Sequence, residues 1–160
     1  MALPKAVIGA AMLLLPLHLI SSSSAPETEP HHPRPAGSPI VLVHGFGGWS
    51  RDDVPGFYYW GGFHDVQQNL RVEGYNVYTA SVGPFSSNWD RACELYAYIK
   101  GGTVDYGEAH VLRFGHKRYG KTYPGVFPQW GENNKIHVIG HSMGGQTARL
   151  MAYLLRHGDK

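Results

Sequence analysis

The sequence predicts an α/β fold with parallel strands, and three observations support this class. Three short apolar segments rich in β-branched residues, 39–46, 75–83 and 135–142, are typical of strands buried on both faces of a parallel sheet. Segments with helical periodicity alternate with them, as the crossovers of a parallel sheet require. The chain has 160 residues, which is enough for one hydrophobic core and too few for two.

The first half of the fold begins at the strand PIVLVHGF. A loop rich in glycine and aromatic residues follows, and then a helix is expected over residues 64–73, where Gly74 ends it. After the strand YNVYTASVG, a second helix is expected over residues 88–100, stopped by two glycines. These elements would form one strand-helix-strand-helix unit.

The second half begins with a long segment without a clear period. We expect residues 101–131 to be irregular, and a loop of this length is commonly functional. The strand KIHVIGHS then leads into a last helix over residues 143–156, with Gly158 as its stop.

The N-terminal residues predict export. One positive charge at Lys5, the apolar run AVIGAAMLLLPLHLI and the following SSSSA are typical of a secretory signal peptide over residues 1–25. The run is shorter than the ~20 apolar residues of a membrane-spanning helix, so no stable span is expected, with an uncleaved anchor as the alternative. The proline-rich, polar residues 26–38 predict a disordered leader, and the folded domain is expected over residues 39–160.

Composition excludes some partners. The formal net charge of +2 is too small to indicate a nucleic-acid partner. Cys93 is the single cysteine, so no intramolecular disulfide can form, and a buried, inert thiol is expected. The oligomeric state stays open.

The segment Gly140-His141-Ser142-Met143-Gly144 has the pattern of a turn that exposes a nucleophilic serine between a strand and a helix. A serine hydroxyl needs a base to take its proton and fixed donors for the developing oxyanion. Met143 would supply one N–H at the start of its helix, and Phe46, after the first strand, would supply the second. The pattern therefore predicts acyl transfer at Ser142.

Other side chains near these turns have less certain roles. His44 and His141 flank the two turns, where shaping the loops is a more natural role than proton transfer. A cluster of aromatic residues could line an acyl-binding cleft or fill a core: Trp49, Phe57, Tyr58, Tyr59 and Trp60. The sequence does not decide between these alternatives.

Several longer motifs carry a family resemblance. The segments PIVLVHGFGGW, YYWGGF, SSNWDRACELYAYIKGGTVDYGEAH, FGHKRYGKTYPG and GHSMGGQTARLM resemble the secreted bacterial triacylglycerol lipases of the staphylococcal and thermoalkaliphilic Bacillus type. The resemblance covers residues 39–158, the N-terminal part of that family's domain. It implies an α/β-hydrolase fold, here ending after the helix that follows the nucleophile, and hydrolysis of glyceride esters at a lipid interface by a Ser-Asp-His triad.

The resemblance also implies metals. The family's structural zinc ligands fall on Asp90, His110 and His116, and the fourth ligand, an aspartate, falls beyond this chain. The six-residue spacing of the two histidines is by itself more typical of surface histidines in a polar loop than of metal ligands. The family's calcium ligands likewise lie outside the sequence.

The triad base is the missing part. In this fold the acid and the histidine follow the serine in that order, and after Ser142 only His157 and Asp159 remain, in the reverse order. The sequence therefore predicts a fragment of a secreted lipase with little activity alone. The alternatives are an inactive lipid- or zinc-binding module, or an esterase or phospholipase of the same fold.

Overall fold

The computed structural model describes residues 37–158. The predicted signal peptide and nearly all of the predicted leader lie outside the described residues. The elements follow in the order β1 (Ile40–Val43), α1 (Val66–Val72), β2 (Val77–Thr79), α2 (Asn88–Lys100), β3 (Gly102–Asp105), α3 (Glu108–Phe114), β4 (Tyr119–Tyr123), β5 (His137–Gly140) and α4 (Met143–His157).

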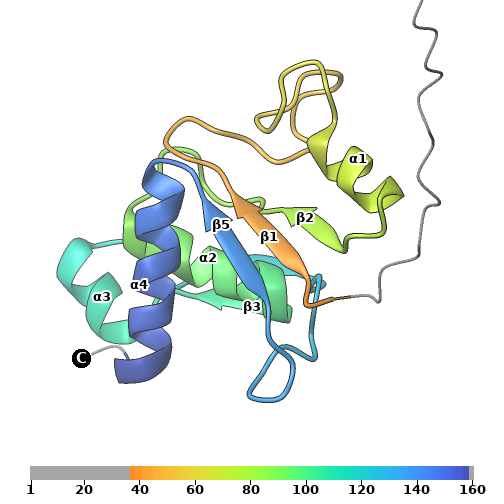
Figure 1. Cartoon of the computed structure of the whole chain (residues 1–160). Helices are drawn as coiled ribbons and strands as arrows, with labels where there is room; N and C mark the ends of the chain where they lie inside the picture. Colours follow the sequence, from red (N-terminus) through yellow and green to blue (C-terminus); the bar gives the residue numbers. More distant parts are fainter. Residues whose placement is uncertain (1–36, 159–160) are drawn as a thin grey trace, which may run out of the picture. The chain divides into compact units, whose positions relative to one another are not determined.

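The main sheet has three parallel strands in the order β2-β1-β5 (Figure 1). β1 lies in the middle, with Ile40 opposite Val77 on one side and His137 on the other. The two strands that carry the candidate oxyanion loop and the candidate serine are therefore direct neighbours. Their carboxyl ends meet at the same edge of the sheet, where a parallel α/β sheet places its ligand sites.

The helices begin where the sequence provides caps. The Asp65 side chain accepts a hydrogen bond from the Gln68 N–H, which starts α1 slightly later than expected. Ser87 caps α2 by accepting from the Asp90 N–H at 3.1 Å, and Gly101 ends that helix with a positive φ of 88°. The expected bounds of α2 are confirmed.

The core lies where α2 and α4 pack on the sheet. Val41 and Val43 of β1 join Leu95 and Ile99 of α2 and Met151 of α4 in one buried cluster. Val41 and Val43 are two residues apart and therefore lie on the same face of the strand, which is the face that packs against α2 and α4. The expected alternation of strands and helices is thus confirmed by the described residues.

The expectation of an irregular segment over residues 101–131 is wrong. This part holds the antiparallel pair β3 and β4 and the short helix α3 between them. Both strands are mostly exposed, with Val104 and Tyr123 as their buried residues, so the sequence shows no apolar alternation. Their pairing depends on a small second cluster in which those two residues pack with Ala97 of α2.

β5 forms one edge of the described sheet. Its residue Ile139 is 49% exposed, whereas Val41 and Val43 on β1 are fully buried. An exposed apolar edge of this kind favours association with another strand. Among residues 37–158, no helix has the length and apolar character needed to cross a bilayer.

Candidate active site and metal centre

The turn after β5 places Ser142 in a strained conformation. Its φ is 54° and its ψ is −125°, and it is the only residue other than glycine with a positive φ in the described part of the chain. Such a conformation costs on the order of 1–3 kcal/mol and persists only where the surroundings impose it. The serine is exposed and stands directly before the first residue of α4.

Three glycines allow the strained turn to pack closely against the sheet. A Cβ on Gly140 would lie 2.4 Å from the Gly144 carbonyl carbon, and a Cβ on Gly144 would lie 2.1 Å from the Val43 oxygen. A Cβ on Gly45 would lie 2.9 Å from the Ser142 Cβ. No side chain fits at these positions, and the loop after β1 therefore comes into contact with the serine.

The two candidate oxyanion donors flank this contact. Phe46 follows Gly45 directly, and Met143 follows Ser142 as the first residue of α4. Neither N–H donates a hydrogen bond to any group in residues 37–158, whereas the next amide, Gly47, donates to the Pro84 oxygen at 2.9 Å. At a helix start the unpaired N–H groups and the helix dipole favour a negative charge.

A buried arginine links the segments around the turn. Arg91 of α2 is fully buried; its guanidinium donates to the His44 oxygen, to the Gly83 oxygen at 2.7 Å and to Thr147 Oγ1 at 3.1 Å. Burial lowers the pKa of Arg91, and the neighbouring Glu94 carboxylate opposes that shift. No local pattern marks this residue, because two of its three acceptors, His44 and Thr147, come from distant segments of the chain.

The two histidines beside the turns contact the backbone and a tyrosine. The buried His44 has Nδ1 2.9 Å from the Gly45 oxygen, and burial lowers its pKa, so the imidazole is neutral at pH 7. The exposed His141 has Nδ1 2.5 Å from the Tyr59 hydroxyl. Both contacts agree with the expectation that these histidines shape the loops.

The histidine that follows Ser142 in the described residues lies at the other end of α4. Ser142 makes no hydrogen bond to a histidine in residues 37–158. His157, at the far end of α4, has Nδ1 3.0 Å from the Tyr153 oxygen. At ~1.5 Å of rise per residue it lies about 22 Å along the helix from Ser142, while a general base must come within about 3 Å. Asp159 lies outside the described residues.

The candidate metal ligands meet between α2 and the β3-β4 region. Asp90 comes from the first turn of α2, His110 from α3 and His116 from the loop after it, and one ligand atom of each lies within 4.8 Å of the others. Asp90 Oδ1 is 3.5 Å from His110 Nε2 and 3.6 Å from His116 Nε2, and it is buried with no hydrogen-bond partner among the described groups. A metal ion would supply the partner that this oxygen lacks.

Neighbouring groups orient these ligands. His116 Nδ1 lies 3.0 Å from the Lys117 oxygen, so its proton is held there and Nε2 is left free to bind. The Trp89 ring stacks on His110 with ring centroids 4.6 Å apart and an interplanar angle of 2°. Ser87 Oγ donates to Asp90 Oδ2 at 2.9 Å. A hollow of about 550 Å³ adjoins the cluster.

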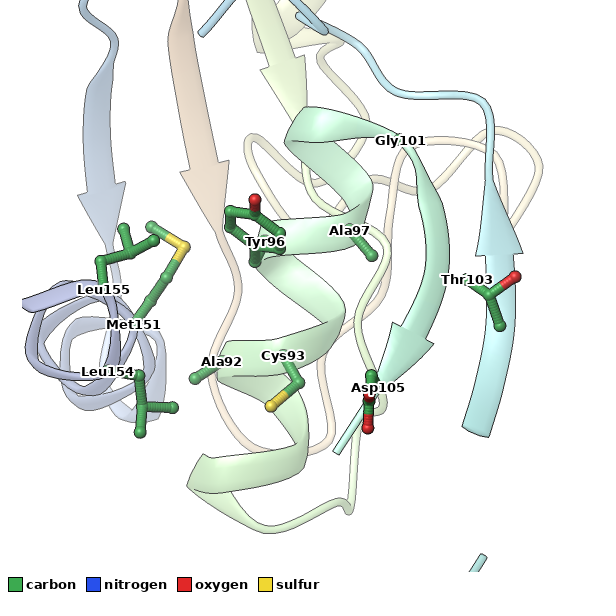
Figure 2. Close-up of a pocket in the computed structure, with 10 residues that line it drawn as sticks. All are labelled: Ala92, Cys93, Tyr96, Ala97, Gly101, Thr103, Asp105, Met151, Leu154 and Leu155. Carbon is green, nitrogen blue, oxygen red and sulfur yellow. The ribbon is translucent and has the colours of Figure 1, made fainter. Parts of the chain in front are cut away.

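A separate apolar groove lies between α2 and α4 (Figure 2), with a volume of about 250 Å³. Met151, Leu154 and Leu155 of α4 face Ala92 and Tyr96 of α2 across it. Ser142 and the two candidate donors are not among its lining residues. The groove is therefore distinct from the serine turn.

The aromatic cluster packs mainly on itself. Tyr59 contacts Trp49, Trp60 and His141 with ring centroids 5.6–5.7 Å apart. A cavity of only about 10 Å³ is lined by Trp49, Tyr58, Tyr59 and Trp60. This volume is too small for an acyl chain. In the described residues, these aromatic rings pack against one another, and Phe57 is exposed.

Comparisons with known proteins identify the family of this chain. The family model described as "Lipase-like, C-terminal domain" matches residues 36–160. Lipase 2 of Staphylococcus aureus strain MRSA252 is 58% identical over 125 residues, which are 76% of this chain and 18% of that protein. This chain therefore spans less than a fifth of that relative.

Solved structures match as well. Lipase 1 from Pelosinus fermentans is 62% identical with a TM-score of 0.72, and the match covers 75% of this chain and 33% of that one. Staphylococcus hyicus lipase is 47% identical with a TM-score of 0.68, over 77% of this chain and 35% of that one. The α/β fold class and the resemblance to staphylococcal lipases are both confirmed. With most of its length matched by one family model, the chain belongs to the lipase family whose model is described as "Lipase-like, C-terminal domain".

Proposed function

We propose that the protein is a serine ester hydrolase that cleaves the ester bonds of acylglycerols at a lipid interface. The observation that carries this proposal is Ser142, an exposed serine with a strained backbone conformation. Its turn lies close to the loop after β1, and this close approach requires glycines at the contact. Family membership supports the reaction class. An esterase or phospholipase preference within the same chemistry is the alternative.

In the proposed mechanism, Ser142 Oγ attacks the ester carbonyl and the alcohol leaves as the acyl-enzyme forms. The N–H groups of Phe46 and Met143 donate to the oxyanion of the tetrahedral intermediate. Water then releases the fatty acid. A histidine and an acid supply the base, and we propose that they come from a part of the full-length protein beyond this chain, since this chain spans 33% of a solved relative.

We propose that Asp90, His110 and His116 hold a structural zinc ion. Ligand atoms bound to zinc at about 2.0–2.2 Å lie about 3.3–3.5 Å apart in a tetrahedron, close to the two Asp90-to-histidine distances. The zinc would join α2 to α3 and the loop after it. A fourth ligand and a calcium site would belong to the remainder of the protein.

We further propose that residues 1–25 act as a cleaved signal peptide, that residues 26–38 form a leader to the domain at 39–160, and that the mature protein is extracellular. The apolar N-terminal run and the lipid substrate both support export.

The test uses the protein expressed from its complete gene. Hydrolysis of tributyrin and of a short-chain nitrophenyl ester should fall by about 10⁶ in Ser142→Ala. A fluorophosphonate should inactivate the unaltered protein, and peptide mass mapping should place the adduct on Ser142. Equal rates for the unaltered protein and Ser142→Ala would contradict the proposed nucleophile and favour an inactive lipid- or zinc-binding module.

A further inference from the structure

The hydroxyl of Tyr59 joins the two turns that carry the proposed oxyanion donors. The Gly45 N–H donates to this hydroxyl at 2.9 Å, and the hydroxyl lies 2.5 Å from His141 Nδ1. Gly45 directly precedes Phe46, and His141 directly precedes Ser142. One side-chain atom thus connects the backbone next to one donor with the residue next to the nucleophile.

The partners of the Tyr59 hydroxyl differ in what they can do. The Gly45 amide can only donate, so the Tyr59 oxygen accepts there. The bond between the hydroxyl and His141 Nδ1 takes its direction from the imidazole tautomer. The rings of Tyr59 and Trp60 pack against the imidazole, with centroids 5.7 and 6.3 Å away, and hold it in this orientation.

Close packing leaves no room for another group to replace the Tyr59 hydroxyl between Gly45 and His141. A Cβ on Gly45 would lie 3.0 Å from the Tyr59 oxygen and 3.2 Å from the His141 backbone oxygen, so the three groups are in contact with no room for another side chain. In the described residues, the Gly45 N–H has no other acceptor. If the hydroxyl is removed, the amide loses its anchor and the adjoining peptide can shift.

We propose that Tyr59 is a positioning residue that sets the spacing between the Phe46 N–H and the Ser142-Met143 turn. This inference rests on the proposed function. Tyr59 does not touch the reacting atoms; it acts through Gly45 and His141. Because oxyanion donors work only when they are held close to their productive geometry, loosening one of them lowers the rate of the chemical step more than it lowers substrate binding.

The first experiment compares Tyr59→Phe with Tyr58→Phe in the protein expressed from its complete gene. Both variants remove one hydroxyl from adjacent residues, and the Tyr58 hydroxyl makes no hydrogen bond within residues 37–158. We expect kcat for a soluble nitrophenyl ester to fall about tenfold in Tyr59→Phe, with KM within twofold. Tyr58→Phe should match the unaltered protein, and the unfolding midpoint should change little in either.

The second experiment adds His141→Phe, which keeps a ring but removes the nitrogen that bonds the Tyr59 hydroxyl. If the bridge acts as one unit, the double variant loses no more activity than Tyr59→Phe alone. Losses that multiply would overturn the bridge, as would a Tyr59→Phe variant with unchanged kcat or with only a raised KM. If the unaltered protein shows no hydrolysis that depends on Ser142, the proposed function fails and this inference fails with it. If hydrolysis does depend on Ser142, the contradicting results for Tyr59→Phe and the double variant overturn this inference alone.

Discussion

The turn that carries Ser142 depends on backbone conformation, whereas the cluster of Asp90, His110 and His116 depends on side chains. At the turn, a Cβ on Gly140 or Gly144 would lie 2.4 or 2.1 Å from a backbone atom, and the candidate donors are amides. At the cluster, one carboxylate and two imidazoles converge from three segments. The serine turn should therefore tolerate almost no change in shape, while the cluster should lose metal affinity stepwise as each ligand is removed.

The largest expected effect breaks the backbone contact. Gly144→Ala places a Cβ 2.1 Å from the Val43 oxygen, which belongs to the central strand and cannot move away. We expect the free energy of unfolding to fall by about 3 kcal/mol or more. Gly145→Ala is the matched control, because its Cβ would be 3.9 Å from the nearest atom and an alanine stabilises a helix by about 0.5–1 kcal/mol. Urea unfolding of both variants measures the contrast; equal stabilities would contradict the backbone account.

The next effect tests the buried link to the turn. Arg91→Met leaves the His44 and Gly83 oxygens and Thr147 Oγ1 without their donor. We expect a loss of about 3 kcal/mol in the free energy of unfolding, together with reduced activity. Arg149→Met, on the exposed side of α4, should stay within about 0.5 kcal/mol of the unaltered protein. A harmless Arg91→Met would mean that the turn does not need this support.

Metal removal tests the cluster. With zinc held at about a hundred times its Kd, chelation should lower the free energy of unfolding by about 2.7 kcal/mol. His110→Ala should abolish most of this response to chelator, whereas His157→Ala, at the end of α4, should keep it. Differential scanning fluorimetry with and without chelator provides the measurement. An identical response in His110→Ala and the unaltered protein would argue against these ligands.

The smallest expected effect separates the backbone strain at Ser142 from the catalytic role of its hydroxyl. Ser142→Gly and Ser142→Ala both remove the nucleophile, so both should be inactive. Glycine adopts a φ of 54° without penalty, and we expect Ser142→Gly to be more stable than Ser142→Ala by about 1 kcal/mol. Thermal unfolding of the two variants compares them directly. A more stable alanine variant would contradict the strain.

Much of the fold could be predicted from local patterns. The end of α2 followed from Gly101 as its stop, and the apolar runs identified the parallel strands. β3 and β4 could not be predicted, because each buries little and their pairing depends on contacts with α2 that have no local signature. Contacts between distant segments also kept Arg91 out of the predicted site.

The sequence by itself determined the strand-turn-helix around Ser142 and the residue types of the metal cluster, since short-range periodicity, glycines and the family motifs carry that information. Only the tertiary structure decided the contacts that no motif marks: Tyr59 with Gly45 and His141, and the Arg91 guanidinium with three oxygens around the serine turn. The physical reason is that hydrogen bonds and close packing between distant segments depend on how the sheet and helices assemble, which residue spacing does not encode.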